Sequence, residues 1–191
     1  MSVGIVDCGG ANLNSIKYAL RRINVDAEVS SSIDVLKTKD AFILPGVGSA
    51  GVVMSYLKNK KLDEFICNTN KLTLGICIGM HVLFDYSEED NTKCLGLING
   101  EIKKFKSDSK PIPQMGWNYV DGIDEFTSIS NYYYFANSYY SRNTKECFGT
   151  SSYINKITSI VRKNNYIGCQ FHPEKSSTAG ELFLKYFINQ I

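Results

Sequence analysis

The sequence has little of what metal-dependent or nucleic-acid-binding proteins require. Its 191 residues include only two histidines and no C-x-x-C pair, whereas zinc sites need clustered ligands. The 21 basic residues are balanced by 19 acidic ones, which gives no reason to expect nucleic acid. The densest basic stretch, Lys103, Lys104, Lys106 and Lys110, is interpreted as a solvated loop. We therefore expect neither a metal nor any other cofactor.

The chain also lacks segments for membranes or export. No run approaches 18 apolar residues, the length expected of a membrane-spanning helix. Residues 1–7 have neither the basic start nor the long apolar run of a signal peptide. The six cysteines are scattered, and without an export signal they are expected to be reduced thiols. These features predict a cytoplasmic protein without a membrane partner.

In the first half of the chain, short apolar runs alternate with helical periodicity. The predicted strands span residues 2–6, 41–44 and 72–76. Helices are predicted at 13–23, where apolar residues are spaced by three and four, and at 53–57, 62–67 and 80–84. Strands that alternate with helices indicate a parallel sheet covered on both faces.

From residue 97 onward the pattern favours strands joined by turns. Strands are predicted at 102–105, 117–120, 132–140, 150–154, 157–162 and 166–171. A last helix is predicted to start near Thr178, because Thr178 and Glu181 match a capping box. We expect one α/β domain over residues 1–191, with a mostly parallel sheet, flanking helices and added antiparallel strands.

Cys77 stands in the segment Gly75-Ile76-Cys77-Ile78-Gly79, between a predicted strand and a predicted helix. This is the layout of a nucleophile elbow, in which a reactive side chain occupies a sharp strand-to-helix turn. Glycine is needed on both sides because the turn brings neighbouring backbone too close for a Cβ atom. Alone, so short a motif fits a buried structural cysteine equally well.

A second segment, Gln170-Phe171-His172-Pro173-Glu174, ends the last predicted strand. In an extended chain, residues two apart point the same way, so Glu174 can orient His172 toward a nucleophile. Pro173 favours that extended geometry. An oriented histidine can activate a nearby cysteine, which favours a triad of Cys77, His172 and Glu174 over an ordinary surface histidine.

A third segment, Leu44-Pro45-Gly46-Val47-Gly48, follows another predicted strand. Its backbone N–H groups could bind an oxyanion, because glycine allows close approach. An ordinary turn would have the same composition. In open α/β sheets, ligands bind at the carboxyl ends of the strands. We therefore expect this loop, Cys77 and His172 to meet in one pocket.

Together these segments resemble the class I glutamine amidotransferases, and more narrowly the glutaminase subunits of imidazole glycerol phosphate synthases of histidine biosynthesis. The similarity covers essentially the whole chain. Met-Gly-Trp-Asn at 115–118 and Phe-His-Pro-Glu-Lys-Ser at 171–176 occur in the order typical of that subfamily. The resemblance implies a flavodoxin-like sheet and a single amidotransferase domain.

The resemblance also implies roles for individual residues. Cys77 would attack the carboxamide of glutamine to form a thioester, His172 would transfer protons and Glu174 would hold the imidazole. Oxyanion donors are implied at Gly46, Val47, Gly48 and Ile78, substrate contacts at Gly79, His81, Glu89, Ser138 and Tyr139, and a partner interface at Asn12 and Trp117. Ammonia would pass to a (β/α)₈-barrel cyclase subunit.

Four positions depart from the family's usual pattern. Ala11 stands where glycine is usual, and His81 replaces a glutamine that normally touches the substrate. Gln114 and Asn137 each replace a histidine. His81 lies four residues after Cys77, on the same predicted helix face, so it should border the pocket.

Because Gln114 and Asn137 lie in segments associated with the synthase contact, the main alternative is a paralogous glutaminase with another partner. Such a protein would supply ammonia for amidination of a surface sugar. A stand-alone thiol hydrolase would use the same Cys–His chemistry but turn over without a partner. A catalytically dead regulatory module also stays open because of His81, although Cys77, His172 and Glu174 are all present.

Overall fold

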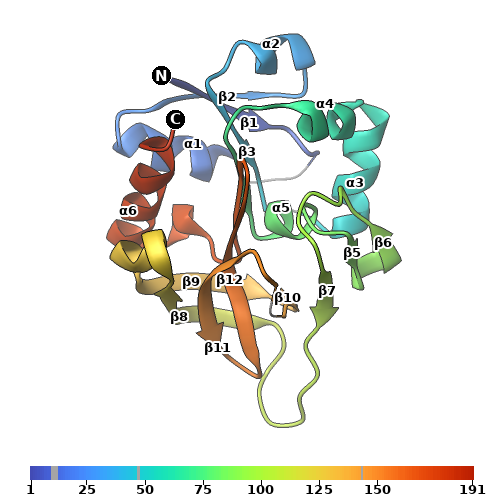
Figure 1. The fold of residues 1–191 in the computed structure, drawn as a ribbon, viewed down its shortest axis with the longest axis vertical. Coiled ribbons are helices and arrows are strands. Elements are labelled where there is room, and N and C mark those ends of the chain that lie inside the picture. Colours follow the sequence, from blue (N-terminus) through green and yellow to red (C-terminus); the bar gives the residue numbers. More distant parts are fainter. Residues whose placement is uncertain (10–12, 47, 143) are drawn as a thin grey trace.

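A parallel sheet forms the centre of the structure (Figure 1). The computed structural model describes residues 1–9, 13–46, 48–142 and 144–191. The central strand order is β2-β1-β3-β4-β13, with each strand parallel to its neighbours. These strands span Asp26–Ser30 (β2), Ser2–Val6 (β1), Ala41–Leu44 (β3), Thr73–Ile76 (β4) and Tyr166–Cys169 (β13). All but β2 are almost wholly buried, as expected of strands covered on both faces.

Helices cover the two faces of this sheet. Helices α1 (Leu13–Arg22) and α6 (Ser177–Ile188) pack together on one side, and α3 (Ala50–Asn59) and α4 (Leu62–Asn68) lie on the other (Figure 1). The short α2 (Ile33–Lys37) follows β2. The predicted class, a parallel sheet with flanking helices, is confirmed.

Beyond β13 the sheet continues with mostly antiparallel strands. Strand β12 (Lys156–Lys163) pairs with β13, and β10 (Tyr139–Ser141) and β7 (Glu101–Lys104) follow it. Strands β11 (Cys147–Ser152), β8 (Gln114–Gly122) and β9 (Asn131–Asn137) extend from β12 in the lower part of Figure 1. The remaining short elements are α5 (Ile78–His81), β5 (Tyr86–Ser87), β6 (Thr92–Lys93), η1 (Glu89–Asn91), η2 (Asp124–Ile129) and η3 (Pro173–Lys175). The predicted antiparallel additions are confirmed.

The helix predicted over residues 80–84 is wrong beyond His81, where α5 ends. The carbonyl groups of Val82, Leu83 and Phe84 accept hydrogen bonds from the backbone of residues 95–98 instead of continuing the helix. Strand β2 carries exposed Asp26 and Glu28 at the sheet edge, so its sequence has no apolar run that predicts it. Tertiary pairing overrides local periodicity in both places.

Two boundaries in the second half also differ from the prediction. The strand predicted over 132–140 is interrupted at Ser138, between β9 and β10. The capping box is wrong, because Ser176 is the N-cap of α6 and Thr178 lies inside the helix. Glu181 instead pairs with Arg22, with 2.7 Å between Oε1 and Nε. That ion pair joins α6 to α1.

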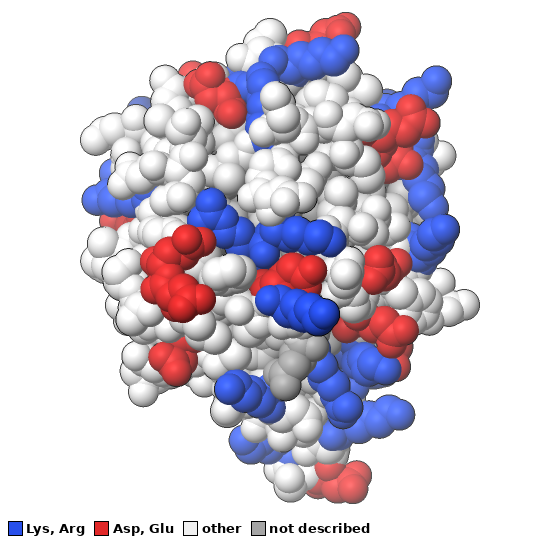
Figure 2. All heavy atoms as spheres, in the orientation of Figure 1, with Lys and Arg blue, Asp and Glu red and all other residues white. Residues whose placement is uncertain are grey.

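Charged side chains of both signs are interspersed over the face shown in Figure 2, and uncharged residues cover most of it. This distribution agrees with the net charge of +2. Among the described residues, every helix is too short or too polar to cross a membrane.

Candidate active site

Cys77 occupies a strained turn between β4 and α5, with φ 51° and ψ −107°. A Cβ added to Gly75 would lie 2.4 Å from the carbonyl oxygen of Gly79. A Cβ added to Gly79 would lie 2.0 Å from the carbonyl oxygen of Leu44. Side chains cannot fit at such distances, so both glycines are required by packing. The predicted elbow geometry is confirmed, and Gly79 allows the elbow to pack against the Leu44 carbonyl at the end of β3.

His172 follows β13, beside the elbow. Its backbone N–H donates to the carbonyl of Tyr134, with 2.9 Å between N and O. Its Nδ1 lies 2.8 Å from Glu174 Oε1, and both side chains are buried. The predicted contact is therefore present, but the predicted extended backbone is wrong at Glu174. That residue lies in η3, whose tight turn brings the carboxylate back to the imidazole.

The aromatic core holds the His172 segment in place. Phe171 stacks on Tyr133 with 4.0 Å between ring centroids and meets Phe183 of α6 edge to face at 5.0 Å. All three rings are fully buried. Because Phe171 is fixed between β9 and α6, the backbone of the next residue is fixed too.

The side chains of His172 and Cys77 lie side by side in the same pocket, close enough to interact. Burial disfavours the imidazolium, but hydrogen bonds and negative charge from Cys77 and Glu174 outweigh this and raise the pKa of His172 to about 10. A protonated imidazole beside a cysteine sulfur is the arrangement found at reactive thiolates. The three side chains predicted as a triad thus lie together, with His172 hydrogen-bonded to Glu174 and in interaction with Cys77.

A pocket of about 260 Å³ opens at Cys77 and His172. Most of the predicted site residues line it, namely Gly46, Gly48, Cys77, Ile78, His81, Glu89, Ser138, Tyr139 and His172. Gly46 abuts the nucleophile so closely that an added Cβ would lie 2.6 Å from the Cβ of Cys77. Val47 and Asn12, together with Ala11, lie outside the described residues. Trp117 is far more open, with 55% of its surface exposed on β8.

Unsatisfied polar atoms concentrate at this site. Among the described residues, four buried side-chain atoms have no hydrogen-bond partner, namely His81 Nδ1, Gln114 Oε1, Asn137 Oδ1 and Glu174 Oε2. His81 and Asn137 line the pocket, Gln114 faces Asn137 across β8 and β9, and Glu174 holds His172. Such atoms are rare in folded proteins, so their clustering indicates a site prepared for a ligand.

Comparison with known proteins assigns the family. The sequence model of the family described as glutamine amidotransferase class-I matches residues 4–190. This chain belongs to the class I glutamine amidotransferases. It is 37% identical to the imidazole glycerol phosphate synthase subunit HisH of Bacteroides fragilis, over 98% of this chain and 99% of that protein.

Two further relatives of this amidotransferase are equally complete. The subunit HisH of Haemophilus influenzae is 36% identical, over 100% of this chain and 98% of that protein. Imidazole glycerol phosphate synthase subunit HisH 2 of Campylobacter jejuni is 40% identical over the full length of both. A crystal structure of a glutamine amidotransferase superposes with a TM-score of 0.79 at 16% identity, covering 98% of this chain and 97% of the other. That last similarity shows the fold.

Two departures from the amidotransferase pattern are neighbours in the structure. Gln114 and Asn137 lie directly opposite each other in the β8–β9 register, and both are buried. Asn137 Nδ2 donates to the carbonyl of Tyr139, which leaves its Oδ1 unpaired. The sequence places these residues 23 positions apart. Only the strand register reveals that they form one pair in the wall of the amidotransferase pocket.

Sequence reasoning missed Pro113 and Ala136, which line the pocket, and also Gln170. Gln170 is fully buried, with Nε2 3.8 Å from Cys77 Sγ and Oε1 2.8 Å from His81 Nε2. The alternation rule applied to Glu174 would have found it, because Gln170 also lies two residues from His172. Gln170 therefore joins the nucleophile to His81.

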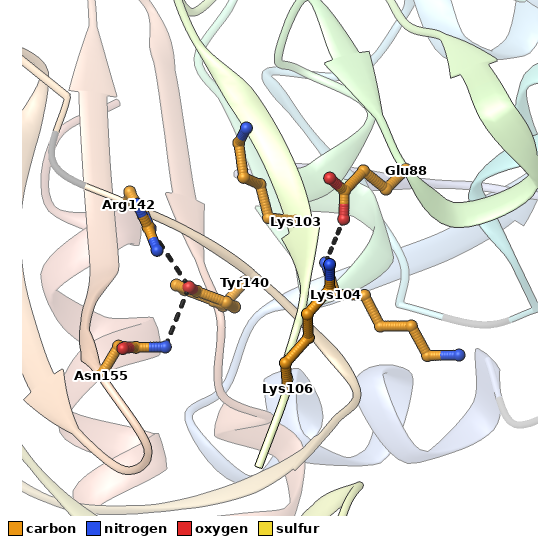
Figure 3. Close-up of a pocket in the computed structure, with 7 residues that line it drawn as sticks. All are labelled: Glu88, Lys103, Lys104, Lys106, Tyr140, Arg142 and Asn155. Carbon is orange, nitrogen blue, oxygen red and sulfur yellow. Dashed lines mark hydrogen bonds between the residues drawn. The ribbon is translucent and has the colours of Figure 1, made fainter.

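A second pocket, of about 330 Å³, is lined by three of the four lysines of the basic stretch (Figure 3). Its lining residues are Glu88, Lys103, Lys104, Lys106, Tyr140, Arg142 and Asn155. Arg142 Nε and Asn155 Nδ2 both donate to the hydroxyl of Tyr140, as Figure 3 shows. The loop interpretation is wrong for Lys103 and Lys104, which lie in β7. Tyr139 lines the first pocket and Tyr140 the second, so β10 separates them.

Proposed function

We propose that this amidotransferase chain is the glutaminase subunit of an imidazole glycerol phosphate synthase. It would hydrolyse glutamine in the cytoplasm and pass the ammonia to a (β/α)₈-barrel cyclase subunit, with one amidotransferase domain over residues 1–191. The proposal is carried by Cys77 and His172 side by side in a pocket of about 260 Å³, with Glu174 hydrogen-bonded to His172 behind them. Relatives 36–40% identical over 98–100% of this chain support the choice of synthase.

The reaction would begin with attack of the Cys77 sulfur on the glutamine side-chain carbonyl. His172 would give its proton to the amide nitrogen, which departs as ammonia. The acyl group stays on Cys77 as a thioester. His172 would then take a proton from water, whose oxygen attacks the thioester, and glutamate would leave as the sulfur regains its negative charge. The buried carboxylate of Glu174 keeps the imidazole oriented through both steps.

Each attack places negative charge on the former carbonyl oxygen. The backbone N–H of Ile78, directly after the nucleophile, and those of the Gly46–Gly48 loop would receive this oxyanion. One such donor typically contributes about 3 kcal/mol in the transition state. The close packing of Gly46 against Cys77 supports this role.

The amino-acid end of glutamine would lie at the opposite wall of the pocket. Glu89 accepts a hydrogen bond from the backbone N–H of Ala50 at 3.0 Å, and its carboxylate would pair with the substrate ammonium group. Burial and the neighbouring charge of Asp90 raise the pKa of Glu89, which the hydrogen bond from Ala50 partly opposes. Ser138 and Tyr139 would contact the substrate through their backbone, and His81 borders the reacting end.

The partner would dock on an exposed aromatic stripe. Met115, Trp117 and Tyr119 alternate on β8, and Tyr132 lies beside them on β9, with exposed fractions of 63%, 55%, 44% and 58%. Exposed apolar clusters of this kind mark interaction surfaces. We assign the stripe to the cyclase subunit, together with Asn12.

The paralogous glutaminase for a surface sugar remains the second candidate. The buried Gln114–Asn137 pair favours it, because both residues replace histidines in segments associated with the synthase contact. The chemistry at Cys77 would be unchanged and only the ammonia acceptor would differ.

Glutamate release with and without candidate partners tests the function. We expect weak turnover alone, strong stimulation by a histidine-pathway cyclase with its substrate, and no activity after Cys77→Ala. Stimulation only by a sugar-modifying partner would favour the paralogue. Peptide hydrolysis without partner stimulation would indicate a thiol hydrolase. If glutamine-analogue electrophiles fail to label Cys77 even with partner present, the protein is a dead regulatory module.

A further inference from the structure

We propose that Gln170 is a positioning residue for the Cys77 sulfur and that His81 fixes Gln170 in this role. The inference deepens the proposed glutaminase function and rests on it. It concerns the contact that Gln170, which is not a triad residue, makes with the sulfur.

The geometry consists of two consecutive hydrogen bonds. Gln170 Nε2 donates to Cys77 Sγ at 3.8 Å, within the range of hydrogen bonds to sulfur, and Gln170 Oε1 lies 2.8 Å from His81 Nε2. Cys77 and His81 are buried, with 4% and 1% exposed, and Gln170 is fully buried. Water therefore does not compete for these contacts, and each bond is stronger than it would be at the surface.

The direction of each bond follows from the atoms involved. An amide oxygen can only accept, so His81 Nε2 must carry the proton that it shares with Gln170 Oε1. The amide can then present only its NH₂ group to the sulfur. Complete burial, partly opposed by the Gln170 bond, lowers the pKa of His81 to about 4, so the imidazole is neutral at physiological pH. His81 thus fixes the amide orientation without adding charge.

A neutral donor at the sulfur complements His172. When the thioester breaks, the sulfur leaves as an anion while His172 is occupied with the proton of the attacking water. Gln170 takes no part in proton transfer, so its N–H remains available to the sulfur throughout. Hydrogen bonds to an ionised acceptor are stronger than those to a neutral one, which makes this donor most effective at the charged stages.

The other ring nitrogen of His81, Nδ1, would contact the substrate. His81 lines the pocket, and its Nδ1 has no partner among the described residues. With the proton on Nε2, Nδ1 is an acceptor for a substrate N–H group. Such a bond would polarise the imidazole and strengthen the two bonds that follow. Occupancy of the pocket is thereby linked to the sulfur by a path that avoids His172.

Alkylation of Cys77 by iodoacetamide, followed from pH 5 to 10 by mass spectrometry of the Cys77 peptide, tests the proposal. Gln170→Leu keeps the volume but removes the donor. We expect the pH midpoint to rise by about one pH unit and the rate at neutral pH to fall about tenfold. Glutamine turnover should lose about tenfold in kcat with little change in KM, because the contact is to the nucleophile and not to the substrate.

His81 supplies the matched pair of variants. His81→Phe removes the donor that orients Gln170 and should reproduce the alkylation profile of Gln170→Leu. His81→Gln restores an N–H group and should recover most of the wild-type profile. The double variant of His81→Phe with Gln170→Leu should be no worse than either single variant, because both break the same chain.

Other ionisable groups around the sulfur are His172 and Glu174 beyond β13, and Cys169 on β13. Burial, with the charges of Glu174 and Cys77, raises the pKa of Cys169 well above its usual range. Glu89 and Tyr139 line the same pocket. The substitutions leave all of these side chains in place, so a profile shifted alike in Gln170→Leu and His81→Phe reports the Gln170 contact. Thermal melts of each variant check that the fold is intact.

An unchanged alkylation profile in folded Gln170→Leu would overturn the positioning role. Additive effects in the double variant would show that His81 does not act through Gln170. If Gln170→Leu fails to fold, equal profiles for His81→Phe and His81→Gln would reject the proposal equally well. Alkylation needs no glutamine turnover, so a protein with shifted profiles but no glutaminase activity would refute the proposed function and leave the positioning role intact.

Discussion

The parallel and antiparallel halves of this protein contribute different things to one pocket. The parallel half, β1 to β4 with β13, sets Cys77 on a turn whose flanking glycines leave no room for a Cβ atom. The antiparallel half supplies Ser138, Tyr139 and the exposed aromatic stripe. Tight packing of the elbow thus fixes the position of Cys77, whereas the proposed partner contact lies on an exposed surface. The following experiments separate these contributions.

The largest effect is expected in the parallel half. Cys77→Ala should remove at least 10³-fold of glutaminase activity, because no other nucleophile of the site can form the thioester. His172→Ala should have a comparable effect. Both variants should still bind the partner, as measured by calorimetry, since their side chains are buried away from the aromatic stripe. Loss of binding in both would contradict the assigned roles.

Packing of the elbow should dominate stability. Gly79→Ala should cost roughly 3 kcal/mol of unfolding free energy, because the new Cβ would lie 2.0 Å from the Leu44 carbonyl oxygen. Urea unfolding measures this. Leu182→Ala in α6 is the control, since that side chain is 47% exposed and its truncation leaves the packing of the elbow unchanged. Equal stability of the two variants would mean that the elbow can relax.

The junction between the halves should show in the pH dependence of stability. The pKa of His172 is raised in the folded state to about 10, above the ordinary value of 6.5. Its contribution is therefore fully present below pH 6.5 and is lost as pH rises toward 10. We expect the free energy of unfolding, measured by urea denaturation, to fall over this pH range by an amount on the order of 1 kcal/mol or more. His172→Gln should flatten the dependence of the unfolding free energy on pH. An unchanged dependence in that variant would contradict a charged His172 paired with Glu174.

The smallest effect on folding is expected in the antiparallel half. Trp117→Ala should change stability by less than about 0.5 kcal/mol, because the side chain is 55% exposed. Partner-stimulated glutamate release should nevertheless fall about tenfold, as for an interface anchor. Tyr18→Ala, at a 58% exposed aromatic on α1, is the matched control. Equal behaviour of the two variants would remove Trp117 from the interface.

The same contrast explains what the sequence could predict. Buried strands such as β3 and β4 are continuous apolar runs, and the glycines around Cys77 encode a turn that few other residues tolerate. The polar edge strand β2, the end of α5 and the break at Ser138 depend on distant backbone partners, which local periodicity does not contain. The Gln114–Asn137 pair requires strand register, and the contacts of Gln170 reach Cys77 and His81 on a distant segment, which its own motif does not contain.

The carbonyl of Tyr134 has a consequence beyond holding His172 in place. The Tyr134 ring meets the Trp117 ring edge to face at 6.4 Å, and its peptide oxygen accepts the His172 N–H at 2.9 Å. One residue of β9 thus contacts both the outer aromatic surface and the backbone of His172. A shift of β9 would therefore be expected to reach the His172 backbone, whereas Cys77 follows β4. The exposed aromatic surface and the His172 backbone thus share one strand, β9.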